Sequence, residues 1–436
     1  MSSAAKPEPA APAKAESNSV FRRTFRAFQY RNFRLLWFGA FTSSSGTWMQ
    51  EAAIGFMVYE MTKREWYQSL NSALGTIPIL LFSLLGGVVA DRIDRRKILM
   101  TSQWLQLVFA LTLSVLAWYH FQSVWPILFI SFLTGCAQAF GGPAYQALMP
   151  VLVDRKEDVA NAVALNSMQF NLARTIGPAV GGWVLALMGA GANNLNYEAA
   201  AVCFAINGIS FVAVVIALFM LQVPPIVRDA SKEKNIGGEM KQGLGFVWHQ
   251  DILRSLTFIS FSATFFGIQF ITFLYPLTLN HFGKGLAEYS VLLSVSGAGS
   301  AAGALFSAWL GDTAHKGKKV LLLQIAGGIA LIILTLSPVI WLGYLLVFIA
   351  SGCLIATFSL TTSLVQLLVP DEMRGRVMSI YMMAFRGGVP LGAMLTGWLT
   401  DKPFHIPLER VLLWEAVFLT LIAVAHLLTN SKVKAS

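Results

Sequence analysis

Long apolar runs separated by short polar turns constrain this chain more than any other feature of its sequence. A helix needs about 20 apolar residues to cross the hydrocarbon core of a bilayer, and these runs reach or approach that length. They are continuous and do not alternate with polar residues, which excludes the strands of a membrane barrel. We therefore predict an all-α integral membrane protein with twelve transmembrane helices. The predicted spans are 35–59, 69–90, 98–119, 124–148, 160–188, 198–221, 252–279, 289–310, 320–336, 339–368, 377–399 and 411–428.

The composition agrees with a membrane location. Of the 436 residues, 56% are hydrophobic and only 12% are charged, whereas a soluble domain carries about 25% charged residues. The net charge of +10 could indicate a nucleic-acid partner, but the cations lie in the turns between apolar runs, where they orient a membrane protein. Cys136, Cys203 and Cys353 all fall inside apolar runs, so neither a disulfide nor a metal site is expected.

The apolar runs form two groups of six on either side of a polar linker. We predict a disordered tail at 1–20, a six-helix bundle at 21–223, a linker at 224–251, a second six-helix bundle at 252–430 and a tail at 431–436. Residues 21–34 are predicted to lie along the membrane interface as an amphipathic segment. With 25 Lys and Arg residues on the linker side of the spans and 5 on the other, the positive-inside rule puts both termini in the cytoplasm.

The two groups also repeat each other in sequence. Both are predicted to start on the same side of the membrane, so they are parallel repeats about an axis along the membrane normal. Secondary transporters use this arrangement, with a binding site near the midplane between the repeats. The matching residues, each set at a constant offset, are Asp91, Arg95, Lys97 and Gln103 with Asp312, Lys316, Lys318 and Gln324, and Ser167, Arg174 and Pro178 with Ser379, Arg386 and Pro390.

A tight basic turn at 87–97 joins the second and third predicted spans. Asp91 ends a helix there and can pair with Arg95, with another loop cation, or with the N-terminus of another helix. Such a contact would form in one conformation of a transporter and break in the other; the alternative is that the turn only anchors the topology. The residues of this predicted conformational latch are Gly87, Asp91, Arg92, Arg95 and Arg96.

Three charged residues lie well inside predicted spans, and we predict transport or coupling roles for them. An arginine at bilayer depth costs about 2.5–3.5 kcal/mol on insertion scales, so Arg174 and its counterpart Arg386 should face a cavity or a partner. Glu51 could exchange a proton during transport, or could be solvated at the external mouth. Glu415 and His426 lie nearer to the ends of their spans, where we expect interfacial positions.

The fifth predicted span carries small residues on one face. Ala173, Gly177 and Gly181 recur at intervals of four, a spacing that lets two helices approach closely. Pro178 removes a backbone donor and favours a kink, and Gly182 follows. This face can serve tight packing, gating, or both.

The sequence contains no phosphate-binding Gly-x-x-x-x-Gly-Lys-Ser/Thr loop, metal cluster, nucleophile elbow or cofactor fingerprint. We therefore expect no enzymatic activity, no cofactor and no metal.

These motifs resemble the major facilitator superfamily. Residues 87–96 (GVVADRIDRR) look like its signature loop, with Asp94 where many members have glycine, and residues 164–182 look like its antiporter motif, with Ala164 and Ala173 at the first two glycine positions. Residues 32–37 (NFRLLW), 48–50 (WMQ), 139–144 (AFGGPA) and 172–178 (LARTIGP) resemble the branch that contains enterobactin exporters and macrolide or multidrug efflux proteins. The resemblance implies a cavity lined by the first, fourth, seventh and tenth helices. Its candidate residues are Gln138, Tyr145, Gln269, Tyr275, Thr361 and Gln366.

Together these observations predict a secondary active exporter of a small molecule, a siderophore or related metabolite, working by alternating access in exchange for protons. We expect a monomer in the bacterial inner membrane, with no nucleic-acid partner. The alternatives are multidrug or macrolide efflux, import of a nutrient, and a non-transporting membrane sensor or scaffold.

Overall fold

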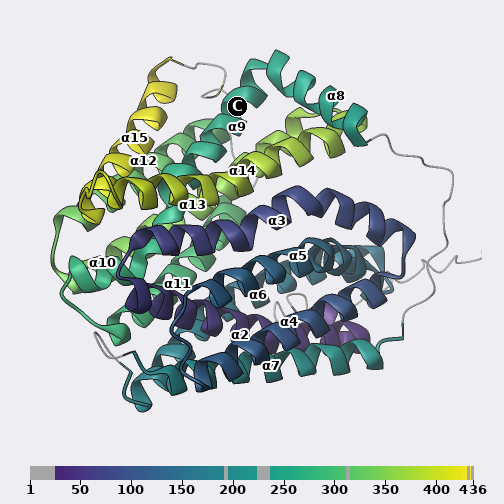
Figure 1. Cartoon of the computed structure of the whole chain (residues 1–436). Helices are drawn as coiled ribbons and strands as arrows, with labels where there is room; N and C mark the ends of the chain where they lie inside the picture. The colour runs from purple at the N-terminus through teal and green to yellow at the C-terminus, as the bar shows by residue number, and fades with distance from the viewer. Residues whose placement is uncertain (1–24, 191–194, 223–235, 311–314, 430–432, 434–436) are drawn as a thin grey trace, which may run out of the picture.

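The computed structural model of the chain describes residues 25–190, 195–222, 236–310, 315–429 and 433, which are helical throughout apart from turns and contain no strand. The parts of the prediction that lie outside the described residues are the tail at 1–20, residues 21–24 of the interfacial segment, residues 224–235 of the linker, Asp312, and the tail at 431–436 apart from Val433. The helices form two groups, one made of α2 to α7 and the other of α8 to α15 (Figure 1).

The first group follows the prediction of six long helices. A short 3-10 helix, η1 (Arg26–Gln29), precedes them, and a second, η2 (Met149–Leu152), follows α5. The long helices are α2 (Arg31–Thr62), α3 (Glu65–Arg92), α4 (Arg95–Trp118), α5 (Trp125–Leu148), α6 (Lys156–Leu187) and α7 (Tyr197–Met220).

The second group differs from the prediction in two places. The predicted linker contains an amphipathic helix, α8 (Ile236–His249), and the seventh span is not one continuous α-helix. That span consists of α9 (Asp251–Ser262), a π-helical turn η3 (Ala263–Gly267), a 3-10 segment η4 (Ile268–Phe273) and α10 (Leu274–Asn280). The remaining helices are α11 (Leu286–Leu310), α12 (Lys316–Leu336), α13 (Ile340–Leu368), α14 (Asp371–Thr400) and α15 (Leu408–Thr429).

Eight segments in the described part of the chain are long and apolar enough to cross a membrane. Four other helices, α2, α3, α6 and α14, have 28 to 32 residues and are therefore also long enough to cross a membrane. The predicted count of twelve spans depends on these four helices. The eight segments are Arg95–Trp118, Trp125–Leu152, Tyr197–Met220, Asp251–Asn280, Leu286–Leu310, Lys316–Leu336, Ile340–Leu368 and Leu408–Thr429.

The turn between α3 and α4 is held by side chains that cap helix ends. Asp94 is the N-cap of α4, and its carboxylate accepts a hydrogen bond of 2.8 Å from the backbone N–H of Arg96. Arg95 donates to the carbonyl of Ala147 at the end of α5, and Arg96 donates to the carbonyl of Phe219 at the end of α7, both at 2.9 Å. These cations satisfy carbonyls that helix ends leave without partners, so the turn joins three helices of the first group.

The N-terminal segment is fixed to α6 through a buried carboxylate. Asp158 is 1% exposed, and it pairs with Arg26 at 3.0 Å and accepts a hydrogen bond of 2.6 Å from the Tyr30 hydroxyl. The carboxylate raises the pKa of the Tyr30 hydroxyl above its usual value, chiefly because it accepts that hydrogen bond. The predicted interfacial segment is therefore docked on the bundle from Arg26 onward.

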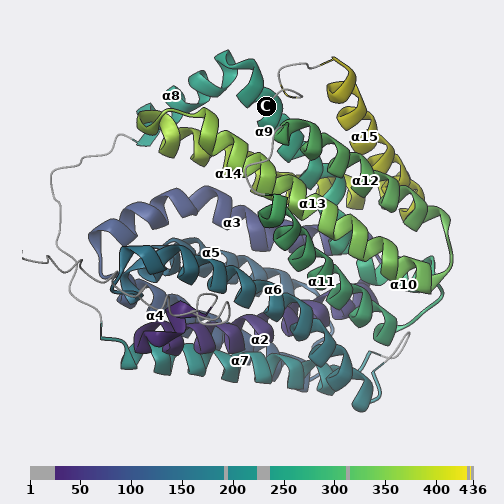
Figure 2. The same ribbon diagram turned by 180° about the vertical axis from the view of Figure 1, so that it is seen from behind.

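The two groups meet along two helix pairs. α3 of the first group lies beside α14 of the second, and α6 lies beside α11 (Figures 1 and 2). Within the groups, α3 packs on α5 and α2 packs on α6 and α7, while α13 packs on α11 and α12. The interface between the halves is thus formed by the second and fifth long helices of one group and their counterparts in the other.

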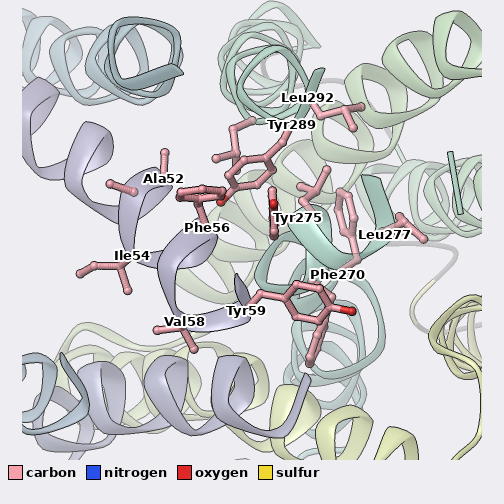
Figure 3. Close-up of a cluster of buried hydrophobic side chains, with 14 of the residues drawn as sticks. Ala52, Ile54, Phe56, Val58, Tyr59, Phe270, Tyr275, Leu277, Tyr289 and Leu292 are labelled. Carbon is pink, nitrogen blue, oxygen red and sulfur yellow. The ribbon is translucent and has the colours of Figure 1, made fainter. Parts of the chain in front are cut away.

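The buried apolar side chains show which end of the bundle is closed. One cluster combines residues of both groups, among them Phe56, Tyr59, Phe270, Tyr275 and Tyr289 (Figure 3). Two further clusters each belong to one group only, one within residues 27–221 and the other within residues 247–433. We call the end with the α2–α3 and α14–α15 loops the closed end, and the opposite end, which carries α8, the linker end. The halves share a core at the closed end and keep separate cores at the linker end.

Candidate functional site

Three side-chain contacts join the two halves at the closed end. The Arg64 guanidinium donates to both carboxylate oxygens of Asp401, and its Nε lies 3.0 Å from Oδ1. The Tyr275 hydroxyl of α10 donates to Glu60 of α2 at 2.7 Å. The amide of Asn280 donates to the Tyr59 hydroxyl at 2.7 Å. Each contact links the end of α2, or the loop after it, to the second half, so all three must break before this end can open.

The ion pair between Arg64 and Asp401 is stable at neutral pH. Hydrogen bonds from Arg64 hold the pKa of the Asp401 carboxyl below its usual range, because they favour the charged form. Because the pKa of Asp401 is lowered, the stabilisation that the ion pair gives to the closed end is fully present above the ordinary pKa of an aspartate. It is lost only as the pH falls through the lowered pKa of Asp401. The pair therefore acts as a fixed contact between pH 5 and pH 8.

Reversing both charges of this pair tests its role. Asp401→Arg should loosen the closed end through repulsion with Arg64, whereas Arg64→Asp combined with Asp401→Arg should restore it. Because Arg64 is partly exposed, we expect a coupling energy of about 0.5–1 kcal/mol. The measurement is the distance between spin labels at Gln122 and Lys402, which lie at this end in different halves. Equal distances in the single and double variants would contradict the role.

Glu51 lies one helical turn from Trp48, the residue that Arg174 contacts, on the side of α2 that faces the other half. The Arg174 guanidinium of α6 stacks over the Trp48 ring of α2, with its Cζ 5.2 Å from the ring centroid. Glu51 follows Trp48 by three residues and is therefore on the same side of α2, one turn nearer the closed end. Gly55, one turn further, faces the hydroxyl of Tyr289 on α11. The Glu51 side chain is exposed although it lies about 16 Å from the end of its helix, which places it beside accessible space facing the other half.

The small residues of α6 allow close contacts on two sides. A Cβ at Gly177 would lie 2.6 Å from the carbonyl oxygen of Ser45 on α2, and a Cβ at Gly182 would lie 2.1 Å from the hydroxyl of Ser290 on α11. From the other side, a Cβ at Gly297 of α11 would lie 2.8 Å from the carbonyl of Arg174. Gly181 packs on Met49 of α2. Ala173 and Pro178 are also buried, and α6 is helical through Pro178. The predicted close packing thus includes the contact between the two halves.

The predicted cavity residues divide into three kinds. Gln269, Tyr275 and Thr361 are at most 1% exposed and are hydrogen-bonded within the protein. Gln138 contacts Gln106 at 3.4 Å, and Tyr145 donates to Asn166 at 2.5 Å; both are half-buried. Gln366 is exposed.

A cavity of about 330 Å³ lies at the linker end of the second half. It is lined by Ser307, Lys316 and Ser359 among others, and by none of the predicted site residues.

Two charged residues of the second half occupy unlike surroundings. Arg386 is exposed on α14 and makes no hydrogen bond or ion pair with a described residue. Glu415 is 3% exposed, accepts a hydrogen bond of 2.6 Å from Thr396 and accepts another from Gln269. The prediction of an interfacial position for Glu415 is therefore wrong, because its carboxylate is held among helices of the second half. His426 stacks on Phe258 and is half-buried.

The basic turn is described only in part. Asp91 and Arg92 end α3, but their side chains lie outside the described residues, so the predicted pairing of Asp91 is untested. A Cβ at Gly87 would meet no atom within 4 Å. Arg95 and Arg96 bind carbonyls of the first half, as described above. Their described contacts lie within one half.

Arg64 is one of the five cations on the side opposite the linker, and no sequence pattern indicated a role for Tyr59, Glu60 or Asp401. Glu60 and Asp401 are acids at the ends of predicted spans, and each is near the external cations in sequence. This proximity of acids to cations was the sequence feature that could have indicated ion pairs at this end. Their partners are 215 and 337 residues away, and no sequence pattern linked them.

Two helical groups that share a core at one end, with charged side chains between them, define a membrane transporter of the major facilitator fold. Solved structures agree: a bacterial homologue of the human lysosomal transporter Spinster superposes with a TM-score of 0.71 at 17% identity, covering 93% of this chain and 99% of its own. The family model described as transmembrane secretion effector, within the major facilitator superfamily, matches residues 23–436, so the chain belongs to that family.

Three curated relatives have names that refer to efflux. The multidrug efflux pump Tap of Mycolicibacterium fortuitum is 27% identical, covering 84% of this chain and 88% of its own. Macrolide efflux protein A of Streptococcus pyogenes is 25% identical, with coverages of 86% and 91%. The enterobactin exporter EntS of Shigella boydii is 24% identical, with coverages of 84% and 85%. The chain is therefore a multi-pass membrane transporter of an efflux family and not an enzyme.

Proposed function

We propose that this protein exports a small molecule across the bacterial inner membrane in exchange for protons. The observation that carries the proposal is the exposed Glu51 carboxylate inside α2, on the face toward the other half and one turn from the Trp48–Arg174 pair. A carboxylate in that position can bind and release a proton as the two halves move. An arginine and an aromatic ring beside it can bind a cargo with anionic and aromatic groups.

The proposed orientation in the membrane follows from the charge distribution. The excess of Lys and Arg at the linker end assigns that end to the cytoplasm. The closed end then faces outward, and the present arrangement is the one that takes up cargo from the cytoplasm. An exporter in this state must next break the contacts at Arg64, Glu60 and Tyr59 to release its cargo outside.

A siderophore or a related anionic metabolite is the proposed cargo. Arg174 and Arg386 both lie on helices that form the interface between the halves, and two cations favour an anionic chelator. The relative named as an enterobactin exporter supports this class. The second candidate is a macrolide or another hydrophobic drug, which the Trp48 ring and the relatives Tap and macrolide efflux protein A favour.

Cells that lack the gene provide the test of cargo and direction. Under iron starvation they should retain siderophore in the cytoplasm and secrete less of it, and complementation with the intact gene should restore secretion. If the cargo is a drug, the same cells should accumulate a labelled macrolide while siderophore secretion is normal. Unchanged levels of both compounds would contradict the proposal.

A further inference from the structure

A second carboxylate, Glu415 of α15, is buried in the second half without a cation. One of its oxygens accepts from Thr396 of α14 and the other from Gln269 of η4. No acidic or basic side chain described on α9, η3, η4, α12 or α14, the elements packed against α15, contacts it. Arg386 lies ten residues before Thr396, about 15 Å along α14. A buried carboxylate with neutral partners only is costly when charged, and a bound proton removes that cost.

The group around Glu415 contains an unused acceptor. Gln269 is fully buried, and its Oε1 atom has no hydrogen-bond partner, while its Nε2 donates to Glu415. A protonated carboxyl gains an O–H donor, and the Gln269 carboxamide can offer either its nitrogen or its oxygen by rotating. A protonated Glu415 needs a hydrogen-bond acceptor for its new O–H group. The Oε1 atom of Gln269 can be that acceptor, because it has no hydrogen-bond partner at present.

Gln269 lies in the irregular part of the seventh span. Upstream, Ser262 ends α9 and accepts a hydrogen bond of 3.1 Å from Gln324 of α12. The π-helical turn η3 and the 3-10 segment η4 follow, so the backbone between Ser262 and Tyr275 departs from a regular α-helix. Irregular turns of this kind are often functional sites within helices. Glu415 and Gln324 hold this segment from two neighbouring helices.

The same segment leads directly to the closed end. Tyr275, six residues after Gln269, donates to Glu60 of the first half, and Asn280 donates to Tyr59. The Tyr275 ring also packs against Phe56 and Tyr289 (Figure 3). A change in the hydrogen bond between Glu415 and Gln269 can therefore be passed along η4 and α10 to the contacts that keep the halves together.

We propose that Glu415 is a proton-binding site of the second half, and that its protonation sets the position of Gln269 and thereby the closure of the bundle by α10. The proton is taken from water, and no other reactant is needed. This inference rests on the proposed proton-driven transport, to which it adds a second site apart from Glu51. Glu51 lies between the halves, whereas Glu415 acts from inside one of them.

The test compares the purified full-length protein with E415Q, and with E198Q as the matched control, because Glu198 is an exposed carboxylate in the first turn of α7. Infrared difference spectra between acidic and alkaline pH report protonated carboxyl groups directly. Wild type and E198Q should show the same bands of buried protonated carboxyls on acidification, and E415Q should lack the one that belongs to Glu415. An unchanged band in E415Q would overturn the assignment of a proton to this residue.

A second measurement follows closure of the bundle. Spin labels at Gln122 and Lys284, in a chain whose three cysteines are alanine, report the distance across the closed end as the pH changes. The distance should shift with pH in wild type and E198Q and should not shift in E415Q. Gln269→Met should keep the infrared band but lose the shift, because it removes the link and leaves the carboxyl. A shift that persists in both E415Q and Gln269→Met would overturn the link.

These measurements use no cargo and no gradient. If proton-driven export fails in vesicles while Glu415 still takes up a proton and alters the closed end, only the proposed function is contradicted. If export is proton-driven while E415Q behaves as wild type in both measurements, the inference about Glu415 is wrong.

Discussion

Replacing Gly297 by valine should open the closed end and abolish transport. Any Cβ at this position would lie 2.8 Å from the carbonyl carbon and oxygen of Arg174, and both atoms belong to the backbone of α6. Backbone atoms cannot rotate away, so α6 and α11 must separate. Overpacking of this kind costs about 1–3 kcal/mol. The ratio of closed to open molecules should therefore fall roughly 5- to 150-fold.

The measurement for Gly297→Val is the distance between spin labels at Gln122 and Lys402, together with transport in proteoliposomes. Gly142→Val is the matched control, because a Cβ at Gly142 of α5 would meet no atom within 4 Å. The control should give the wild-type distance and transport rate. If Gly297→Val also gives the wild-type distance, the α6–α11 contact does not hold the halves together.

Glu51→Gln should uncouple transport from the pH gradient. Glutamine keeps the size of the side chain but cannot bind and release a proton, so the pH gradient should no longer drive accumulation. We expect accumulation to fall at least about tenfold, which corresponds to about 1.4 kcal/mol of lost driving force. Exchange of labelled for unlabelled cargo without a gradient should continue, since Trp48 and Arg174 are unchanged.

Glu198→Gln is the control for the Glu51 variant, because Glu198 is an exposed carboxylate in the first turn of α7 and lies away from the interface. It should accumulate cargo as the wild type does. If both variants accumulate cargo in a pH gradient as the wild type does, Glu51 does not carry the coupling proton.

The architecture was predictable because its causes are local in sequence or repeated in it. Apolar runs of sufficient length indicate helices, and the offsets that relate Arg174 to Arg386 indicate two similar halves. The spacing of Gly177 and Gly181 predicts close helix contacts, and the structure has them against α2. An arginine inside a span needs a partner, but the sequence did not identify the Trp48 ring as that partner.

The closed end could not be predicted, because it depends on residues distant in sequence. Arg64 and Asp401 stand at the ends of different helices, and only the packing of α3 on α14 brings them together. The irregular seventh span was also missed. A π-helical turn and a 3-10 segment keep the same apolar composition as an α-helix, so residues 252–279 look like one continuous helix. The burial of Glu415 depends on that irregular segment, which places Gln269 beside it.

Uptake of labelled siderophore and labelled macrolide into inside-out membrane vesicles tests the central claim most directly. Vesicles that contain the protein and acidify their interior should accumulate at least one of the two compounds, and an uncoupler that dissipates the proton gradient should abolish the accumulation. Vesicles without the protein supply the background. Accumulation of either compound that is equal with and without the uncoupler would contradict proton-driven export, and accumulation of neither would contradict the proposed cargo classes.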